Sequence, residues 1–581
     1  MEKTLSEYLS LAEKIIPNKH KKIIKIGFLS SFTINGLPEI IKTKCDEKQI
    51  SCKTYLSGYN QYNQEILDPN SNFYRFSPDL TFLVLDNRTI LEDFFYYPYD
   101  SDEESRKDFA NKKIHELLNL IEIFSKNSSS KLIITNLYIP SFSPHGIAET
   151  NYNFGFHDLI FYFNSELKKS LKEMDSVFLF DMNGFVTKYG EDNVFNYQNY
   201  FFGDIKISLE FLPQLGEHFM SYIIAFLGLT KKCIVLDLDN TLWGGIVGED
   251  GFDGIKLGPQ PPGNVFLEFQ KYLKTLSQRG IILAINSRNN VDDAINVIKN
   301  HPYMILKKED FSCIVINWGD KVQNMREIAK QLNLGLDSFV FFDDDPVNRA
   351  YVKKEIPEVS VPELPSDPSN YVKILLSLND FNSFQITPED LSRKTMYNQQ
   401  KQRLELQNNT SNIDDFLKSL GLRVVIKKAD SFTIPRISQL TLKTNQFNLT
   451  TKRYQKEDIE KFSLDENCLI GSAQVFDKFG DNGITGVFIL KHEKPTEWIL
   501  DSFLLSCRVM GRQIENAIMN YIIEQAKQNG IKTLKAQFIP TEKNIPIQDF
   551  LPSCGFEKIE NFWIYYLEKP FNSPKFVNVE E

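Results

Sequence analysis

The sequence predicts a multidomain α/β protein, and three observations lead to that prediction. The chain has 581 residues, more than a single hydrophobic core usually serves. Short apolar runs alternate with helical patterns through its first two thirds, as in parallel sheets that are covered by helices. The last third contains strand-like runs in succession, which is typical of a mixed α+β domain. We therefore expect three domains, at residues 1–229, 230–380 and 385–570.

The first block alternates between apolar runs and helical patterns. Its apolar runs are bounded by polar segments, as buried parallel strands are. The expected strands are Lys25–Ser30, Leu80–Leu85, Lys131–Thr135 and Val177–Asp181, with helices near Lys112–Phe124 and Leu159–Lys172. This alternation predicts a sheet with helices on both faces.

The second block shows the same alternation over a shorter stretch. The expected strands are Cys233–Asp237, Ile281–Asn286 and Ser338–Phe342, with helices near Val265–Arg279 and Asp320–Leu332. A stretch with three prolines, Val361–Pro368, then breaks the pattern. Proline punctuates regular structure, so this stretch is expected to be a linker or a crossing segment.

The third block differs from the other two because strands follow one another with few helices between them. The expected strands are Leu422–Lys427, Cys468–Val475, Gly486–Lys491, Trp498–Leu505 and Thr533–Ile539, with one helix at Arg512–Gln528. No internal repeat or low-complexity tract interrupts the chain.

The composition indicates which classes of partner the protein binds and in which cellular compartment it lies. The formal net charge is −10, which argues against a dedicated nucleic-acid binder because such proteins need a basic face. The seven cysteines include no CxxC pair, which excludes the usual zinc-ribbon and thioredoxin patterns. The N-terminus lacks a secretory apolar segment, and no apolar stretch is long enough to span a membrane. We expect a soluble cytoplasmic protein that binds neither nucleic acid nor membrane.

The residues that carry chemistry follow the strands of the second block. Asp237 and Asp239 come directly after an apolar run, where residues of a parallel sheet face the ligand crevice. Two carboxylates in this spacing are able to divide a phosphoryl transfer between them. Asp237 would attack phosphorus, and Asp239 would protonate the leaving oxygen and later activate water.

Further strand ends supply the remaining groups that phosphoryl transfer requires, which are mainly positioning and charge neutralisation. Ser287 would hydrogen-bond a phosphate oxygen, and Lys321 would neutralise developing charge. Asp343 and Asp344 offer hard oxygen ligands for Mg²⁺. A lone DxD motif is often only a turn, but an ordered set of strand-end groups is much harder to explain by coincidence.

These segments resemble the FkbH-like branch of the haloacid dehalogenase (HAD) superfamily of phosphatases. The similar segments are Asp237–Gly251 (DLDNTLWGGIVGEDG), Ser287–Asn290 (SRNN), Asn317–Lys321 (NWGDK) and Phe341–Pro346 (FFDDDP). The resemblance implies that Asp237 is the nucleophile and Asp239 the acid/base. It also implies phosphate contacts from Thr241, Ser287, Arg288 and Lys321, and Mg²⁺ held by Asp237, Asp239, Asp343 and Asp344.

The chain departs from this family at two positions. Arg288 replaces a usual lysine, which keeps the charge but not its geometry. Asp345 replaces a usual asparagine, and it either adds a carboxylate near the metal or faces solvent. The gaps from Thr241 to Gly263 and from Lys321 to Asp343 are too short for a sizeable cap domain. We therefore expect an open site, which favours a large substrate such as a carrier protein or closure by a flanking block.

Two tryptophans, Trp243 and Trp318, lie next to these motifs. They would either wall the site or serve as packing residues, and packing is the favoured interpretation.

The third block extends the resemblance. Residues 440–454 contain the KTNQFNLT segment of the same family, and residues 508–513 (RVMGRQ) resemble the pyrophosphate loop of GNAT acyltransferases. In such a loop, amides at a helix N-terminus bind coenzyme A phosphates, which would involve Arg508, Gly511 and Arg512. Gln513 stands where a small residue is expected. The block either receives a phosphopantetheine arm or is only a scaffold. Cys507 would hold a thioester or, as we favour, is a small packed residue.

The first block resembles the SGNH-hydrolase-like domain of longer family members, a flavodoxin-like α/β/α domain. Leu29–Thr33 takes the place of the nucleophile loop, and Gly58 and Asn136 that of oxyanion-hole residues. A working hydrolase also needs a histidine held by an aspartate, and His218 lacks the usual Asp-x-x-His context. We interpret this domain as non-hydrolytic and used for docking or support, with Ser30 and Ser31 as turn residues.

For its better-understood members, the family implies a reaction of 1,3-bisphosphoglycerate. The glyceryl unit is dephosphorylated and loaded on the phosphopantetheine thiol of an acyl carrier protein, which feeds polyketide or nonribosomal peptide biosynthesis. A plain phosphatase of a small phosphorylated metabolite or polysaccharide precursor is the first alternative. An interaction protein with an incidental HAD site is the second, and a coenzyme A acyltransferase is a weaker one because of Gln513.

Overall fold

The computed structural model describes residues 3–408, 410 and 412–581. The chain is a multidomain α/β protein that divides into two compact units, Met1–Phe226 and Leu227–Glu581. The first unit contains one five-stranded sheet, and the second contains a four-stranded sheet and a nine-stranded sheet. No helix among the described residues combines the length and apolar character that a membrane crossing requires.

The sheet of the first unit is entirely parallel and has the strand order β2-β1-β3-β4-β5. This 2-1-3-4-5 order is the doubly wound order found in flavodoxin. The strands are β1 (Lys22–Ser30), β2 (Ile50–Leu56), β3 (Leu80–Val84), β4 (Lys131–Thr135) and β5 (Val177–Phe180). The sequence reasoning missed β2, because polar residues interrupt this edge strand and it lacks the apolar run of the other four.

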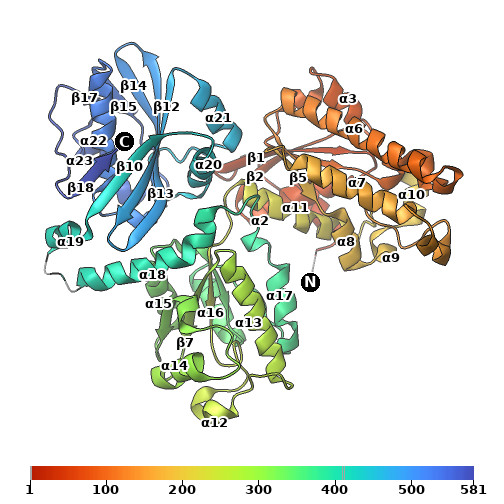
Figure 1. Ribbon diagram of the computed structural model, residues 1–581, viewed down its shortest axis with the longest axis horizontal. Coiled ribbons are helices and arrows are strands. Elements are labelled where there is room, and N and C mark those ends of the chain that lie inside the picture. The colour runs from red at the N-terminus through yellow and green to blue at the C-terminus, as the bar shows by residue number, and fades with distance from the viewer. Residues whose placement is uncertain (1–2, 409, 411) are drawn as a thin grey trace. The chain divides into compact units, whose positions relative to one another are not determined.

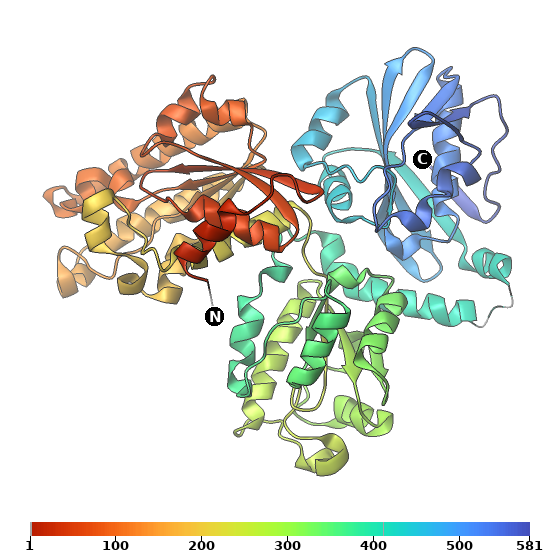
Figure 2. The same ribbon diagram turned by 180° about the vertical axis from the view of Figure 1, so that it is seen from behind.

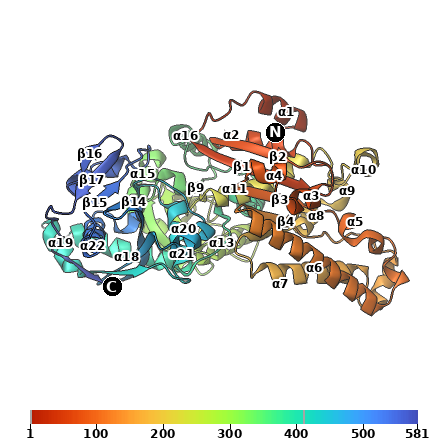
Figure 3. The same cartoon turned by 90° about the horizontal axis from the view of Figure 1, so that it is seen from above.

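Helices cover both faces of this sheet. On one face α6 packs against α7, and on the other α1, α2 and α11 pack together. Figure 3 shows α1 and α2 on the opposite side of the strands from α6 and α7, and Figure 1 shows the same unit from another direction. The helices are α1 (Leu5–Glu13), α2 (Leu37–Glu47), α3 (Tyr62–Leu67), α4 (Asn72–Phe76), α5 (Asn87–Leu91), α6 (Glu103–Asn127), α7 (Phe156–Leu171), α8 (Met182–Tyr189), α9 (Glu191–Val194), α10 (Tyr197–Gly203) and α11 (Leu212–Phe226). The predicted helix at Lys112–Phe124 is the central part of α6, which Asp102 caps by accepting from the Ser105 amide.

The four-stranded sheet of the second unit is also parallel, with the order β8-β7-β6-β9. Its strands are β6 (Cys233–Leu236), β7 (Ile282–Ser287), β8 (Phe311–Ile316) and β9 (Phe339–Phe342). In chain order this is 3-2-1-4, so the winding direction reverses between β6 and β9. Ligands of open α/β sheets bind at such a switch point, outside the carboxyl ends of the strands.

Two apolar layers enclose this sheet. One is made by α13 (Gly263–Gln278), α14 (Val291–Asn300) and α17 (Tyr371–Ser377), and the other by α15 (Lys321–Leu332) and α16 (Pro346–Glu355). Figure 2 shows these helices around the strands from behind. The proline-bearing stretch Val361–Pro368 is a crossing segment, because Ser360 bridges to Val340 of β9 and Leu364 is buried in the first layer.

The nine-stranded sheet is mixed, in agreement with the predicted α+β class. Its path is β16-β17-β15-β14-β13-β12-β10-β18, with β11 paired to β14. Its strands are β10 (Leu422–Lys428), β11 (Phe447–Asn448), β12 (Cys468–Asp477), β13 (Gly480–Lys494), β14 (Glu497–Leu505), β15 (Thr533–Ala536), β16 (Glu557–Ile559), β17 (Phe562–Tyr566) and β18 (Val577–Glu580). The helices of this region are α18 (Pro388–Asn408), α19 (Ile413–Leu420), α20 (Ile434–Lys443), α21 (Lys456–Leu464), α22 (Ile514–Gln528) and α23 (Phe550–Ser553).

The helix predicted to begin at Arg512 begins at Ile514 instead. Gln513 has a φ of 61°, a left-handed conformation that ends the preceding loop and cannot be part of a right-handed helix. The turn therefore separates the side chain of Arg512 from the first turn of α22.

Candidate active site

The candidate site lies where β6 and β9 end side by side. The Asp237 amide donates to the Phe342 carbonyl at 2.9 Å, so the parallel register continues one residue past β6. Asp343 follows β9 directly. The two carboxylates are thus placed together at the switch point of the sheet, which is the position that the sequence predicted for the chemistry.

Lys321 lies between these two carboxylates. Its Nζ is 2.8 Å from Asp237 Oδ1 and 3.1 Å from Asp343 Oδ2, and it donates to the Asn286 carbonyl at 2.7 Å. The side chain is only 1% exposed, so water screens these charges little. A cation fixed here is able to neutralise negative charge that develops on a bound phosphoryl group.

Three carboxylates form a group that is suited to a metal ion. One oxygen from each of Asp237, Asp343 and Asp344 lies within 4.8 Å of the others. Burial, followed by the neighbouring Asp237 charge, raises the pKa of Asp343, and the same causes raise the pKa of Asp344 to about 6. The buried Asp237 Oδ1 approaches Lys321 but accepts no directed hydrogen bond. A hard divalent cation fits this excess of oxygen ligands and negative charge.

Asp239 has different surroundings, which suit an acid/base group. Its Oδ1 accepts from Trp243 Nε1 at 2.8 Å and from the Val247 amide at 3.1 Å, and its Oδ2 accepts from Asn289 Nδ2 at 2.8 Å. Burial raises the pKa of Asp239, which favours the protonated form that a general acid requires. The carboxylate lies outside the three-member metal group, so its predicted role as a metal ligand stays a prediction.

Thr241 and Arg349 fix the loop that carries the second pair of acidic residues. The completely buried Thr241 accepts the Asp344 amide through Oγ1 at 3.2 Å. Arg349 Nη1 donates to the carbonyls of Asp343 at 2.8 Å and Asp344 at 2.7 Å, and Nη2 donates to the Leu364 carbonyl. Thr241 thus has a positioning role, and its predicted phosphate contact stays a prediction.

Two of the predicted phosphate-binding residues follow β7. Ser287 ends this strand and is buried at the site. Arg288 is exposed, and its Nε donates to the Gly319 carbonyl at 3.1 Å. The substitution of arginine for lysine therefore ties the loop after β7 to the loop before α15. The contacts of these two residues do not test a phosphate interaction, which stays a prediction.

An asparagine network that the sequence reasoning missed holds Lys321 in place. Asn324 Nδ2 donates to Asn286 Oδ1 at 3.1 Å and to Asn317 Oδ1 at 3.0 Å, and Asn286 Nδ2 donates to the Lys321 carbonyl at 2.9 Å. Asn289, Asn348 and Arg349 were missed in the same way. Their only signal in the sequence was proximity to the motifs. Asn289 contacts Asp239 of another loop, whereas Asn348 and Arg349 contact the adjoining loop after β9.

Asp345 and Trp243 have structural roles, whereas Trp318 does not. Asp345 caps α16 by accepting the Val347 amide at 2.8 Å, so its carboxylate has a helix-capping role. Trp243 is fully buried, and it packs in the core besides donating to Asp239. Trp318 is 77% exposed, so the prediction that it is a packing residue is wrong. The segment between β6 and α13 holds only the short helix α12 (Val247–Gly254), so it contains no cap domain.

The two arginines of the loop before α22 make contacts inside the domain. Arg512 Nη1 lies 3.3 Å from Asp477 Oδ2, a carboxylate that Arg403 also pairs with at 2.6 Å. Arg508 donates to the Asn482 carbonyl. Gly511 has a φ of 73° and open space around it. Cys507 packs beside the core under β9, and Asn333 donates to its carbonyl. Whether this loop binds a phosphopantetheine arm, and whether Cys507 forms a thioester, stay predictions.

In the first unit the serines of the predicted nucleophile loop accept hydrogen bonds from the backbone. Ser30 Oγ accepts from the Phe32 amide and Ser31 Oγ from the Asp86 amide. Asn136 donates to Asp181. The ring of His218 lies among Phe180, Phe185 and Tyr189, and burial lowers its pKa to about 4. The two serines have the hydrogen bonds of turn residues, and the interpretation of the domain as non-hydrolytic stays a prediction.

Comparison with known proteins identifies the family. The family model described as FkbH, N-terminal domain matches residues 25–224. The crystal structure of the N-terminal part of BF1531 from Bacteroides fragilis, described as containing a phosphatase domain complexed with Mg, is 32% identical. That similarity covers 66% of this chain and 99% of the solved chain, with a TM-score of 0.60. A GNAT-family acetyltransferase from Staphylococcus aureus Mu50 is 15% identical over 25% of this chain and 99% of its own, with a TM-score of 0.21.

No curated protein matches the chain significantly. The family model covers the first unit, and the Bacteroides structure has a phosphatase domain and extends over two thirds of the chain. The strand-end carboxylates and the buried lysine are those of a HAD-type phosphatase. The chain therefore belongs to the FkbH-like family of HAD phosphatases.

Proposed function

We propose that this phosphatase is Mg²⁺-dependent and acts on a phosphoglyceryl group that is loaded on an acyl carrier protein. The single observation that supports the chemistry best is the buried lysine between Asp237 and Asp343 at the switch point. Its Nζ lies 2.8 Å from Asp237 Oδ1 and 3.1 Å from Asp343 Oδ2, so the charge of the Asp237 carboxylate is compensated. A carboxylate held in this way is able to act as a nucleophile.

The reaction follows from the places of the two aspartates. An oxygen of Asp237 attacks phosphorus, the bond from phosphorus to the substrate oxygen breaks, and Asp239 gives its proton to that oxygen. Asp239 then takes a proton from water, whose oxygen attacks the phosphorus of the aspartyl phosphate, and inorganic phosphate leaves with Asp237 restored. Trp243, Val247 and Asn289 hold the Asp239 carboxyl in place through both steps.

Asp237, Asp343 and Asp344 would hold Mg²⁺ in this proposal, and the ion would neutralise charge on the phosphoryl oxygens. Asn348 and Arg349 orient this ligand set. Asn348 Nδ2 donates to Asp343, and Arg349 holds the backbone on both sides of the Asp343–Asp344 peptide bond. The Mg in the Bacteroides phosphatase structure supports the choice of metal.

Substrate and partner are proposed from the family resemblance and the open site. The phosphopantetheine thiol of an acyl carrier protein would attack the acyl carbon of 1,3-bisphosphoglycerate, with the 1-phosphate as leaving group. The 3-phosphate would then be removed at Asp237. A site without a cap domain, with only α12 between β6 and α13, is able to admit a substrate tethered to a protein. The seven free cysteines support a reducing cytoplasmic location.

The test is an incubation of the full chain with 1,3-bisphosphoglycerate, Mg²⁺ and a panel of phosphopantetheinylated carrier proteins. Intact-protein mass spectrometry follows the carriers, and a phosphate assay follows release. We expect a glyceryl mass on one carrier with wild type and a phosphoglyceryl mass or none with Asp237→Asn. Phosphate release with no carrier adduct on any member of the panel would contradict the carrier proposal but not the phosphatase.

A plain phosphatase of a small phosphorylated metabolite or polysaccharide precursor is the second candidate. One observation favours it. The cations of the loop before α22 are engaged inside the domain, with Arg512 on Asp477 and Arg508 on the Asn482 carbonyl. Hydrolysis of small phosphomonoesters at a rate that no carrier protein increases would support this candidate.

A further inference from the structure

A pocket in the first unit lies at the carboxyl edge of the five-stranded sheet. Asp86 and Arg88 follow β3, and Tyr138 follows β4. In the 2-1-3-4-5 order the winding reverses between β1 and β3, so these residues lie at the switch point where open α/β sheets bind ligands. The Ser31 hydroxyl, after β1, accepts the Asp86 amide at 2.9 Å and joins the two strand ends.

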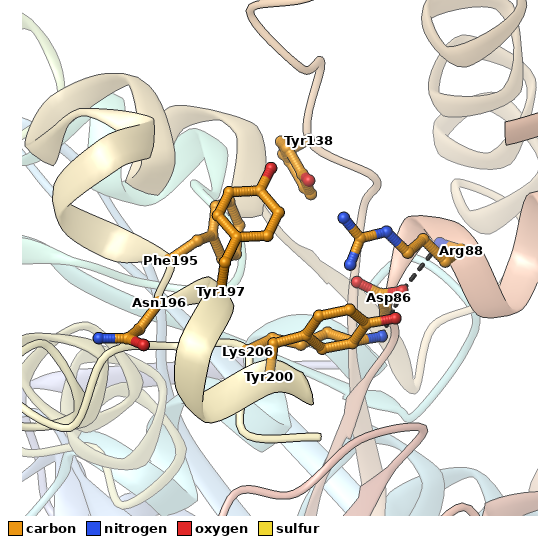
Figure 4. A pocket seen from close by; sticks show the side chains of 8 residues that line it. All are labelled: Asp86, Arg88, Tyr138, Phe195, Asn196, Tyr197, Tyr200 and Lys206. Carbon is orange, nitrogen blue, oxygen red and sulfur yellow. Dashed lines mark hydrogen bonds and ion pairs between the residues drawn. The ribbon is translucent and has the colours of Figure 1, made fainter. Parts of the chain in front are cut away.

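The walls of the pocket are aromatic and come mainly from α10 and the residues beside it. Tyr197, Tyr200, Phe195 and Tyr138 line it together with Asn196 and Lys206. In Figure 4 the Arg88 side chain reaches in between Tyr138 and Tyr200, toward Tyr197. Its guanidinium carbon lies 4.4 Å from the centre of the Tyr200 ring and 5.7 Å from that of Tyr197. Stacking on aromatic rings holds the guanidinium plane in a fixed orientation.

The charges of the pocket are unequally paired. Lys206 Nζ is 2.5 Å from Asp86 Oδ2 and 3.6 Å from Asp204 Oδ1, and Lys206 and Asp86 are nearly inaccessible to water. Asp86 Oδ2 also accepts the Arg88 amide at 2.8 Å. Among the described residues, no carboxylate lies within ion-pair distance of the Arg88 guanidinium. Arg88 is therefore the cation of the pocket whose charge is not matched.

One polar atom of this cation and one of the neighbouring residue lack a hydrogen-bond partner. Arg88 Nε and Asn87 Oδ1 are buried and make no hydrogen bond among the described residues. Buried polar groups are nearly always hydrogen-bonded, so these two atoms beside a cavity are a donor and an acceptor that a bound molecule is able to engage. The space inside the pocket is about 270 Å³ when the part open to solvent is counted, and the enclosed part is much smaller. A ligand held here would therefore be small.

We infer that this pocket binds a small metabolite through an oxyanion, a carboxylate or a phosphate, that pairs with Arg88. Arginine matches the oxygen spacing of both groups with two parallel hydrogen bonds. The tyrosine rings enclose the rest of the ligand, which the cavity limits to a few carbon atoms. Lys206 and Asp86 form the neutral floor. The inference concerns binding and no catalysis, because the Ser31 hydroxyl accepts the Asp86 amide and the His218 ring lies among aromatic rings. The inference does not depend on the phosphatase reaction.

The test titrates the full chain in EDTA with glycerate, glycerol 3-phosphate and inorganic phosphate by isothermal calorimetry. The first two share a three-carbon skeleton and differ in the anion, so they separate the carboxylate from the phosphate source. We expect one site for at least one probe. Arg88→Met should weaken it roughly tenfold or more, the usual effect of losing hydrogen bonds to a charged group.

Two variants control for the rest of the molecule. Arg75→Met removes an exposed arginine outside the pocket, and Lys321→Met alters the phosphatase site. Neither should change the affinity. The inference is overturned if no probe binds at millimolar concentration, if Arg88→Met binds as wild type does, or if Lys321→Met removes the binding. If circular dichroism shows that Arg88→Met does not fold, Arg88→Lys is the variant that tests the inference. Lysine keeps the positive charge but not the two parallel N–H donors of arginine. A weakened affinity in Arg88→Lys supports the inference, and an unchanged affinity contradicts it.

Discussion

Two parallel sheets of this chain have switch points, and they gather opposite kinds of side chain there. The four-stranded sheet places Asp237, Asp343 and Asp344 around one buried lysine. The five-stranded sheet places an unmatched arginine among tyrosine rings, with its one carboxylate already paired. The first arrangement attracts a cation and the second attracts an anion. The topology provides the crevice in both cases, and only the side chains at the strand ends decide the chemistry.

The largest effect should come from removing the nucleophile. Asp237→Asn keeps the shape of the side chain but not its charge, so we expect phosphatase activity to fall by roughly a thousandfold or more. Asp345→Asn is the matched control, because asparagine also caps a helix well, and it should retain nearly full activity. Initial rates of phosphate release measure both. Equal losses of phosphatase activity in the two variants would contradict the role of Asp237 as the nucleophile.

The next effect concerns the buried charges. Lys321→Met leaves Asp237 and Asp343 facing each other without the cation between them, and breaking a buried pair typically costs about 3–5 kcal/mol. Urea unfolding without metal should show a loss of this size. Added Mg²⁺ should recover part of it, because the ion supplies positive charge to the same carboxylates. A stability that Mg²⁺ does not change in this variant would contradict the proposed metal site.

The sequence predicted the strand-end groups better than the contacts that hold them. Asp237, Lys321 and Asp343 were recognisable because each follows an apolar run, and parallel strands bring such positions to one edge. Asn324 was not, since residues that are far apart in the sequence hold it. Asn324 lies one helical turn beyond Lys321, yet its partner Asn286 lies in β7 and its partner Asn317 follows β8.

The first unit shows the same limit. Its strands were recognisable except for the polar edge strand β2, and the doubly wound architecture was predicted. The Arg88 pocket was not, because α10 and Lys206 are brought to the strand ends by loops that have no regular pattern. An isolated arginine or tyrosine in a loop also gives no signal in composition. Side chains that converge from separate loops need the fold before they can be grouped.

Arg349 offers a way to sharpen the comparison, because it binds the backbone of its own site loop, whereas Arg88 of the five-stranded sheet lines a pocket. Arg349→Lys loses the paired donors to the Asp343 and Asp344 carbonyls. Small displacements of catalytic groups reduce rates strongly, so we expect activity to fall roughly ten- to hundredfold while the chain stays folded. Full activity at saturating Mg²⁺ would show that the loop needs no such support.

The smallest effect concerns His218 of the first unit, where burial lowers the pKa to about 4 from the usual 6.5. The unfolded chain takes up this proton as the pH falls below about 6.5, whereas the folded chain takes it up only near pH 4, so folding stability is lost across that window. With allowance for the partly exposed ring, the loss should be about 1 kcal/mol. His218→Gln, which keeps a group able to contact the Tyr189 hydroxyl, should remove this part of the pH dependence of urea unfolding. The same slope in wild type and variant would mean that the ring protonates freely in the folded unit, and a histidine that does so next to the five-stranded sheet would reopen the hydrolase interpretation of that edge.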